Sequence, residues 1–168
     1  MMKKMYLVFF LIFAVFLSIS ANAFIKSGYV LSNPGNVKYK ISSTIMQYSS
    51  TLVTSTATWA DKCAKIGVSN VSSDENIYFY GDLGVANGTY ATCHHTSSSY
   101  KVITFYSSFV NLSSVRKNET IVHEVGHALG LNHTQTANDT ISVMRAVGFN
   151  DKDYPLSDDI AGIADIYK

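Results

Sequence analysis

The sequence reads His123-Glu124-Val125-Gly126-His127-Ala128-Leu129-Gly130-Leu131-Asn132-His133 towards its C-terminal end. On a helix, residues four apart share one face, so His123 and His127 can reach the same metal ion from successive turns. Glu124 follows the first histidine, where its carboxylate can reach a water on that metal rather than bind the metal itself. The stretch therefore predicts a helix that carries two metal ligands and a general base.

A third ligand becomes possible if this helix ends at Gly130, because glycine adopts the positive φ that turns the chain back. His133 can then face the same metal ion. Three protein ligands leave one tetrahedral position for water, as in a catalytic zinc site, whereas a structural site is closed by four. Imidazole nitrogens suit zinc, although their spacing also permits other divalent metals. The alternative, ordinary polar residues on an amphipathic helix, does not account for the glycine and third histidine at fixed offsets.

Residues 1–23 have the composition of a signal peptide. A short basic start precedes the apolar run Met5–Ile19, which is too short to span a membrane comfortably. Ala21-Asn22-Ala23 then provides the small residues that signal peptidase requires. We therefore expect a secreted or periplasmic protein that begins at Phe24 and forms one catalytic domain over residues 24–168, with a retained membrane anchor as the alternative.

The net charge is +1, only 15% of the residues are charged, and no basic cluster is present. Neither nucleic acid nor an anionic membrane is therefore a favoured partner. We expect a monomer that acts on a protein or peptide substrate.

Cys63 and Cys93 are the two cysteines of the chain. In an oxidising compartment, a disulfide between them is the first expectation. The alternative is that one of them caps the zinc as an inhibitory thiolate, but neither lies in a segment that precedes the domain.

Hydrophobic periodicity predicts an α+β domain with a mixed or largely parallel sheet. The expected strands are residues 37–41, 66–71, 76–80, 89–93 and 101–106. The first expected helix has an apolar stripe from Ile45 to Cys63. The second starts between Ser113 and Asn118 and ends at Leu129, and Ser157 is the N-cap of the last.

The pattern H-E-x-x-H-x-x-G-x-x-H resembles that of the metzincin metalloproteases, and Ser142-Val143-Met144 resembles the Met-turn that completes their signature. The segment from Tyr154 to Ile163 is similar to the start of the C-terminal helix of matrixins, a metzincin branch. Val37–Ile41 and the helix around Trp59 likewise resemble the first strand and first helix of matrixins. The resemblance implies a twisted, mostly parallel five-stranded sheet with a packing helix, an active-site helix and a C-terminal helix.

The resemblance also implies a zinc-dependent endopeptidase in which Glu124 is the general base and Met144 forms a hydrophobic floor under the metal. An edge strand, residues 89–93 here, would bind an extended substrate through its backbone. The side chains expected to contact substrate are Tyr90, Val147, Phe149 and Tyr154. Two alternatives stay open: a non-catalytic zinc-bearing binding module, and an effector protease with narrow specificity.

Four features depart from the matrixin pattern. No propeptide cysteine lies between the signal peptide and the domain, so we expect no latency by that route. His94-His95 lacks the His-x-Asp pattern of a structural zinc site and is interpreted as loop polarity, with substrate contact or an adventitious metal as the alternatives. Arg145-Ala146-Val147 replaces the usual Pro-x-Tyr after the Met-turn. Asp82 and Asn87 lie in a glycine-rich loop that can bind calcium, although one carboxylate is a minimal ligand set.

Overall fold

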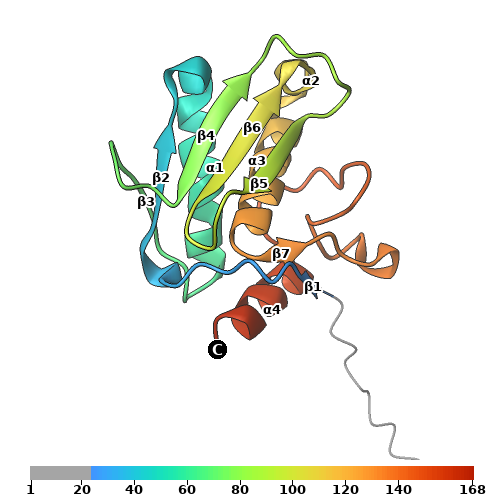
Figure 1. The fold of residues 1–168 in the computed structure, drawn as a ribbon. Helices are drawn as coiled ribbons and strands as arrows, with labels where there is room; N and C mark the ends of the chain where they lie inside the picture. The colour runs from blue at the N-terminus through green and yellow to red at the C-terminus, as the bar shows by residue number, and fades with distance from the viewer. Residues whose placement is uncertain (1–23) are drawn as a thin grey trace, which may run out of the picture.

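The computed structural model describes residues 24–168, which Figure 1 colours from blue to red. The predicted signal peptide, residues 1–23, lies outside the described residues. None of the helices within residues 24–168 combines the length and hydropathy that a membrane span requires.

A five-stranded sheet with the strand order β3-β2-β4-β6-β5 forms the centre of the domain. Four of these strands run parallel to one another, and β5 pairs antiparallel with β6 at one edge. The strands are β2 (Val37–Ile41), β3 (Val68–Asn70), β4 (Ile77–Asp82), β5 (Ala91–His95) and β6 (Lys101–Tyr106). The predicted α+β class with a mixed, mostly parallel sheet is therefore confirmed.

Two long helices cover one face of this sheet, as Figure 1 shows. Every second residue of β2, β4 and β6 is buried, as expected when one face of a sheet packs on helices. Trp59 is fully buried between the helices, and its Nε1–H donates a hydrogen bond to the Val122 carbonyl at 3.1 Å. The helices are α1 (Ser49–Lys62), α2 (Ser107–Val110), α3 (Ser114–Ala128) and α4 (Ser157–Ile166).

Two short strands and three short 3-10 segments complete the described fold. The N-terminal strand β1 (Ile25–Lys26) pairs antiparallel with β7 (Leu131–Asn132), which follows α3. Short 3-10 helices form at Pro34–Asn36, Ser43–Tyr48 and Thr136–Asn138. The second of these helices precedes α1, so the apolar stripe predicted as one helix from Ile45 to Cys63 belongs to two elements.

The edge strand β5 begins and ends two residues later than the predicted strand 89–93. Its register is set by β6, because Cys93 lies opposite Ile103 and His95 lies opposite Lys101. Pairing of this kind overrides the weak strand preference of polar residues. His94 and His95, predicted as loop residues, are therefore the last two residues of β5.

The predicted disulfide is wrong, because Cys63 and Cys93 are both free. Cys63 caps the end of α1 and lines a small cavity with Ile160 and Ile163 of α4. Cys93 lies in β5 and faces a different cavity, described below. A disulfide needs Cα atoms within about 7 Å, and these two elements place the thiols in separate parts of the domain. Burial raises the pKa of the Cys63 thiol to about 11, so it is protonated at neutral pH.

Candidate active site

Helix α3 carries the first two histidines of the motif. Its buried face consists of fully buried apolar residues that pack towards α1, namely Ile121, Val122, Val125 and Ala128. His123 and His127 lie one turn apart on a different face, where both are partly buried. Packing of the apolar stripe thus fixes which way the two imidazoles point.

Gly130 redirects the chain after α3. Its φ of +104° is a conformation that other residues rarely adopt, and a Cβ at this position would lie 3.1 Å from the Val30 side chain. The chain then enters β7, and the backbone N–H of Thr134 donates to the Met144 carbonyl at 2.7 Å. These contacts hold His133 beside the two helical histidines, as the sequence predicts.

The three imidazoles form a cluster suited to a metal ion. One ligand nitrogen from each of His123, His127 and His133 lies within 4.8 Å of the other two. Among residues 24–168, no other group of three histidine, cysteine, aspartate or glutamate side chains comes together in this way. The cluster therefore agrees with the metal-ligand set predicted from spacing, whereas nothing comparable supports a calcium site at Asp82 and Asn87.

The protonation of these rings favours zinc. A carbonyl can only accept, so the Nδ1–H of His123 donates to Val143 O at 2.7 Å, and that of His127 donates to Leu131 O at 2.9 Å. Both Nε2 atoms are then unprotonated, yet they lie 3.0 Å apart. Two facing lone pairs are unfavourable without a cation between them, and backbone carbonyls on the other ring nitrogen are typical of zinc ligands.

Burial also keeps the two helical histidines neutral. It lowers the pKa of His123 to about 4 and that of His127 to about 3. Neutral imidazole is the form that binds a metal, so these two side chains are in the binding form at neutral pH.

Glu124 lies next to this cluster and is only 6% exposed. Its Oε2 atom is buried and has no hydrogen-bond partner. Burial raises the pKa of Glu124 to about 8, and a hydrogen bond from the backbone of Cys93 offsets part of this effect. The site thus contains a carboxylate oxygen that is available to accept a proton.

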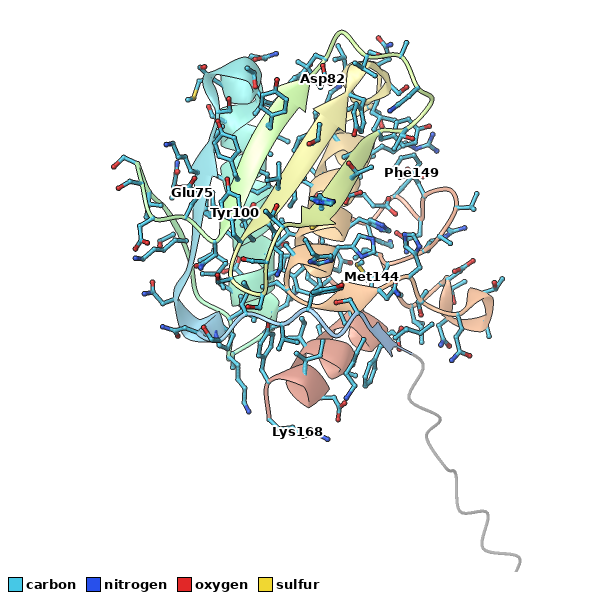
Figure 2. All side chains as sticks on the ribbon, viewed as in Figure 1. Glu75, Asp82, Tyr100, Met144, Phe149 and Lys168 are labelled. Atoms are coloured by element: carbon cyan, nitrogen blue, oxygen red, sulfur yellow. The ribbon has the colours of Figure 1, made fainter. Side chains whose placement is uncertain are left out.

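Met144 is buried against α3, and Figure 2 shows it on the same side of the molecule as Phe149. A Cβ built at Gly126 would lie 2.4 Å from the Met144 sulfur and 3.0 Å from the Trp59 ring. Glycine at this position therefore lets the thioether approach the backbone of α3. This placement agrees with a hydrophobic floor under the candidate zinc site.

A cleft of about 700 Å³ opens over the histidine cluster. Strand β5 forms one side of it, α3 forms the base, and residues 145–149 form the opposite wall. Tyr90 and Phe149 line the cleft with ring centroids 5.3 Å apart, and Val147 lies at its rim with 80% of its surface exposed. Tyr154 lies outside the cleft, where the Lys62 ammonium faces its ring at 5.1 Å.

Glu119 and Tyr29 are two of the cleft residues that the sequence-based prediction missed. Glu119 is 2% exposed and accepts hydrogen bonds from the backbone N–H groups of Asn150 and Lys152, at 2.9 and 3.2 Å. Glu119 therefore connects the cleft wall to α3. It lies four residues before His123, and so on the same face of the helix, which is a signal in the sequence that could have identified it. Tyr29 reaches the cleft from the N-terminal segment, and no local pattern in the sequence indicates this.

Comparison with known proteins agrees with this geometry. The profile of the family described as Matrixin matches residues 33–168, whereas no significant match is found among curated protein sequences. A structure of myroilysin is similar to this one with a TM-score of 0.64 and 14% identity over 86% of this chain and 98% of that chain. A second myroilysin structure gives 0.61 and 17% identity over 85% and 88%. The GM1-bound form of the ECX AB5 holotoxin gives 0.60 and 17% identity over 84% and 83%. The chain therefore belongs to the matrixin family of zinc metallopeptidases and has the metzincin fold.

Proposed function

We propose that this protein is an exported zinc endopeptidase in which His123, His127 and His133 hold the metal and Glu124 is the general base. The observation that carries this proposal is the buried, unpartnered Oε2 of Glu124 beside three converging imidazoles in an open cleft. A binding module without catalytic activity has no need for such an oxygen, because an unpartnered buried carboxylate destabilises the fold. Export rests on the composition of residues 1–23.

Strand β5 supplies the binding surface for the substrate backbone. It is the last strand in the sheet order, so one of its edges is not paired within the sheet. An extended peptide can add to this edge through main-chain hydrogen bonds, which places its carbonyl groups over the histidine cluster. Recognition through the backbone is typical of cleavage within a chain rather than at its end.

Glu124 moves the proton in the proposed reaction. Zinc bound by the three imidazoles would act as a Lewis acid towards a water molecule and the peptide carbonyl. Oε2 of Glu124 accepts the proton of the attacking water and then passes it to the leaving amine.

The test compares the zinc content and activity of residues 24–168 with those of two variants. We expect the wild type to bind about one zinc and to hydrolyse a mixed protein substrate, and Glu124→Ala to keep the zinc but lose at least roughly a hundredfold in rate. Glu75→Ala is the matched control, since Figure 2 shows Glu75 on the opposite side of the molecule from Phe149. Equal rates for wild type and Glu124→Ala contradict the assigned base.

A second candidate is an effector protease that cleaves one protein only. One of the similar structures is that of an AB5 holotoxin, so this fold also occurs in a toxin. If the wild type binds zinc but cleaves no mixed substrate, this candidate or the binding module replaces the general endopeptidase. Cleavage of many unrelated peptides excludes it.

A further inference from the structure

The N-terminal segment forms one end of the cleft. Ser27 is fixed by two hydrogen bonds to the Gly130 carbonyl, from its backbone N–H at 2.8 Å and its hydroxyl at 3.1 Å. Leu31 is fixed by a hydrogen bond from its N–H to the Tyr167 hydroxyl at 3.3 Å. Tyr29 lies between these two attachments, so its position is set by the fold rather than by a free terminus.

Tyr29 stacks on His95 at the end of β5. The ring centroids are 4.7 Å apart, the ring planes differ by 12°, and both side chains line the cleft. Tyr29 is 51% exposed, so the stack covers only part of its ring. The Nδ1 atom of His95 is buried and has no hydrogen-bond partner. The pair therefore offers a flat, partly uncovered aromatic surface.

A buried cation lies close to this surface. Lys101 is fully buried, its ammonium donates to the carbonyls of Ser97 and Ser98, and it lies 5.9 Å from the Tyr29 ring centroid. A positively charged substrate side chain would be repelled here. Among side chains that stack on aromatic rings, this favours an aromatic group over arginine.

A second aromatic pair, Tyr90 and Phe149, lies at the other end of the cleft. Tyr90 immediately precedes β5 and His95 ends it, a separation of about 17 Å along an extended strand at roughly 3.4 Å per residue. Glu124 lies between the two pairs, because it accepts its hydrogen bond from Cys93 within β5. A peptide bound along β5 would meet one aromatic pair on each side of the reacting bond.

We propose that Tyr29 and His95 form a specificity subsite that selects an aromatic side chain of the substrate, at the opposite end of the cleft from Tyr90 and Phe149. The inference rests on the proposed function, because the subsite serves the same cleft. It assigns substrate selection to an N-terminal residue far in sequence from the zinc motif. A stacked aromatic contact contributes roughly a two- to tenfold preference beyond the area it buries, so a measurable effect is expected.

The experiment uses zinc-loaded protein and peptides that differ only in phenylalanine or alanine at each position along the cleft. We expect the wild type to prefer phenylalanine by roughly fivefold or more in kcat/KM at one position on the Tyr29 side. Tyr29→Ala should reduce this ratio to about twofold or less, and His95→Ala should reduce it as well, whereas Tyr29→Phe should retain it. Tyr80→Ala, an exposed tyrosine of β4 outside the cleft, should also retain it.

Binding of the same peptides to Glu124→Ala, with and without Tyr29→Ala, separates the two proposals. If the wild type does not cleave, the proposed function fails, yet calorimetry still shows whether Tyr29 selects phenylalanine. An unchanged ratio in both Tyr29→Ala and His95→Ala overturns the subsite, and so does the absence of any preference in the wild type. Thermal unfolding of each variant confirms that the proteins being compared are folded.

Discussion

Asp159 is the buried residue whose removal should damage the fold and the candidate site together. It is 1% exposed, and its carboxylate accepts hydrogen bonds from the Ser142 hydroxyl and from the backbone N–H groups of Val143 and Leu156. The Val143 carbonyl in turn accepts the Nδ1–H of His123. A carboxylate on α4 is thus connected to a candidate zinc ligand on α3 through a single residue.

The expected magnitude follows from the groups left without a partner. Asp159→Ala removes the acceptor for two backbone N–H groups and one hydroxyl, and each buried orphan costs about 1–3 kcal/mol. Because Leu156 is only partly buried, we expect the lower part of the summed range: a fall in the free energy of unfolding of about 3–6 kcal/mol, out of the roughly 5–15 kcal/mol of a small domain. That corresponds to a decrease in Tm of roughly 10–20 °C. Asp159→Asn keeps one oxygen for the two N–H groups, and its amide can donate to the Ser142 hydroxyl, so about 1–2 kcal/mol is expected.

Thermal and denaturant unfolding measure the Tm and the free energy of unfolding, and competition with a chelator measures zinc affinity. We expect Asp159→Ala to bind zinc roughly 10- to 100-fold more weakly, because the carbonyl that orients His123 loses its support. Asp165→Ala is the control, since its carboxylate pairs only with the lysines at positions 26 and 168 on the surface, and it should change neither quantity appreciably. A Tm for Asp159→Ala within about 3 °C of wild type, with unchanged zinc affinity, would refute the reasoning.

Three further predictions concern other parts of the domain. Burial raises the pKa of Glu119, so the folded chain binds a proton on this carboxyl more tightly than the unfolded chain does. The free energy of unfolding should therefore fall as the pH rises just above the usual glutamate pKa. In urea unfolding between about pH 4 and pH 7, the free energy of unfolding of Glu119→Gln should depend less on pH than that of the wild type. An equal pH dependence in both proteins would contradict the assignment. Gly126→Ala should cost about 1–3 kcal/mol in thermal unfolding by displacing Met144, and an unchanged Tm would show that the two do not pack. A thiol reagent should label both Cys63 and Cys93 in unfolded, unreduced protein, whereas a disulfide would leave both unlabelled.

The parts of the site that local rules control could be predicted from the sequence. Spacing of four residues places His123 and His127 on one helical face, and Gly130 has the positive φ that returns the chain towards His133. Both features depend only on backbone geometry within about ten residues. The helix bounds Ser114–Ala128 accordingly agree with the predicted start and end.

The parts that depend on pairing between distant segments could not be predicted. The register of β5 is fixed by β6, so its start at Ala91 rather than residue 89 follows from a partner strand. The disulfide prediction was wrong for a similar reason: two cysteines in a chain expected to be exported permit a bridge, but only the fold decides whether the thiols approach each other. Tyr29 lies in the cleft because β1 pairs with β7. The sequence of residues 25–26 does not by itself indicate this pairing.

Helix α3 explains how selection of substrates can change without loss of the metal site. One face packs in the core through buried apolar residues such as Val122, and another face carries the histidines together with Glu119, whose carboxylate binds the cleft wall. The side chains at the two ends of the cleft, Tyr29 and Phe149, come from segments whose backbone N–H groups donate to the Gly130 carbonyl and to the Glu119 carboxylate, respectively. Backbone attachment does not depend on which side chain is present. Substitutions at the two cleft ends can therefore alter substrate preference while the histidines keep their positions, whereas substitutions on α3 itself must preserve all of its faces.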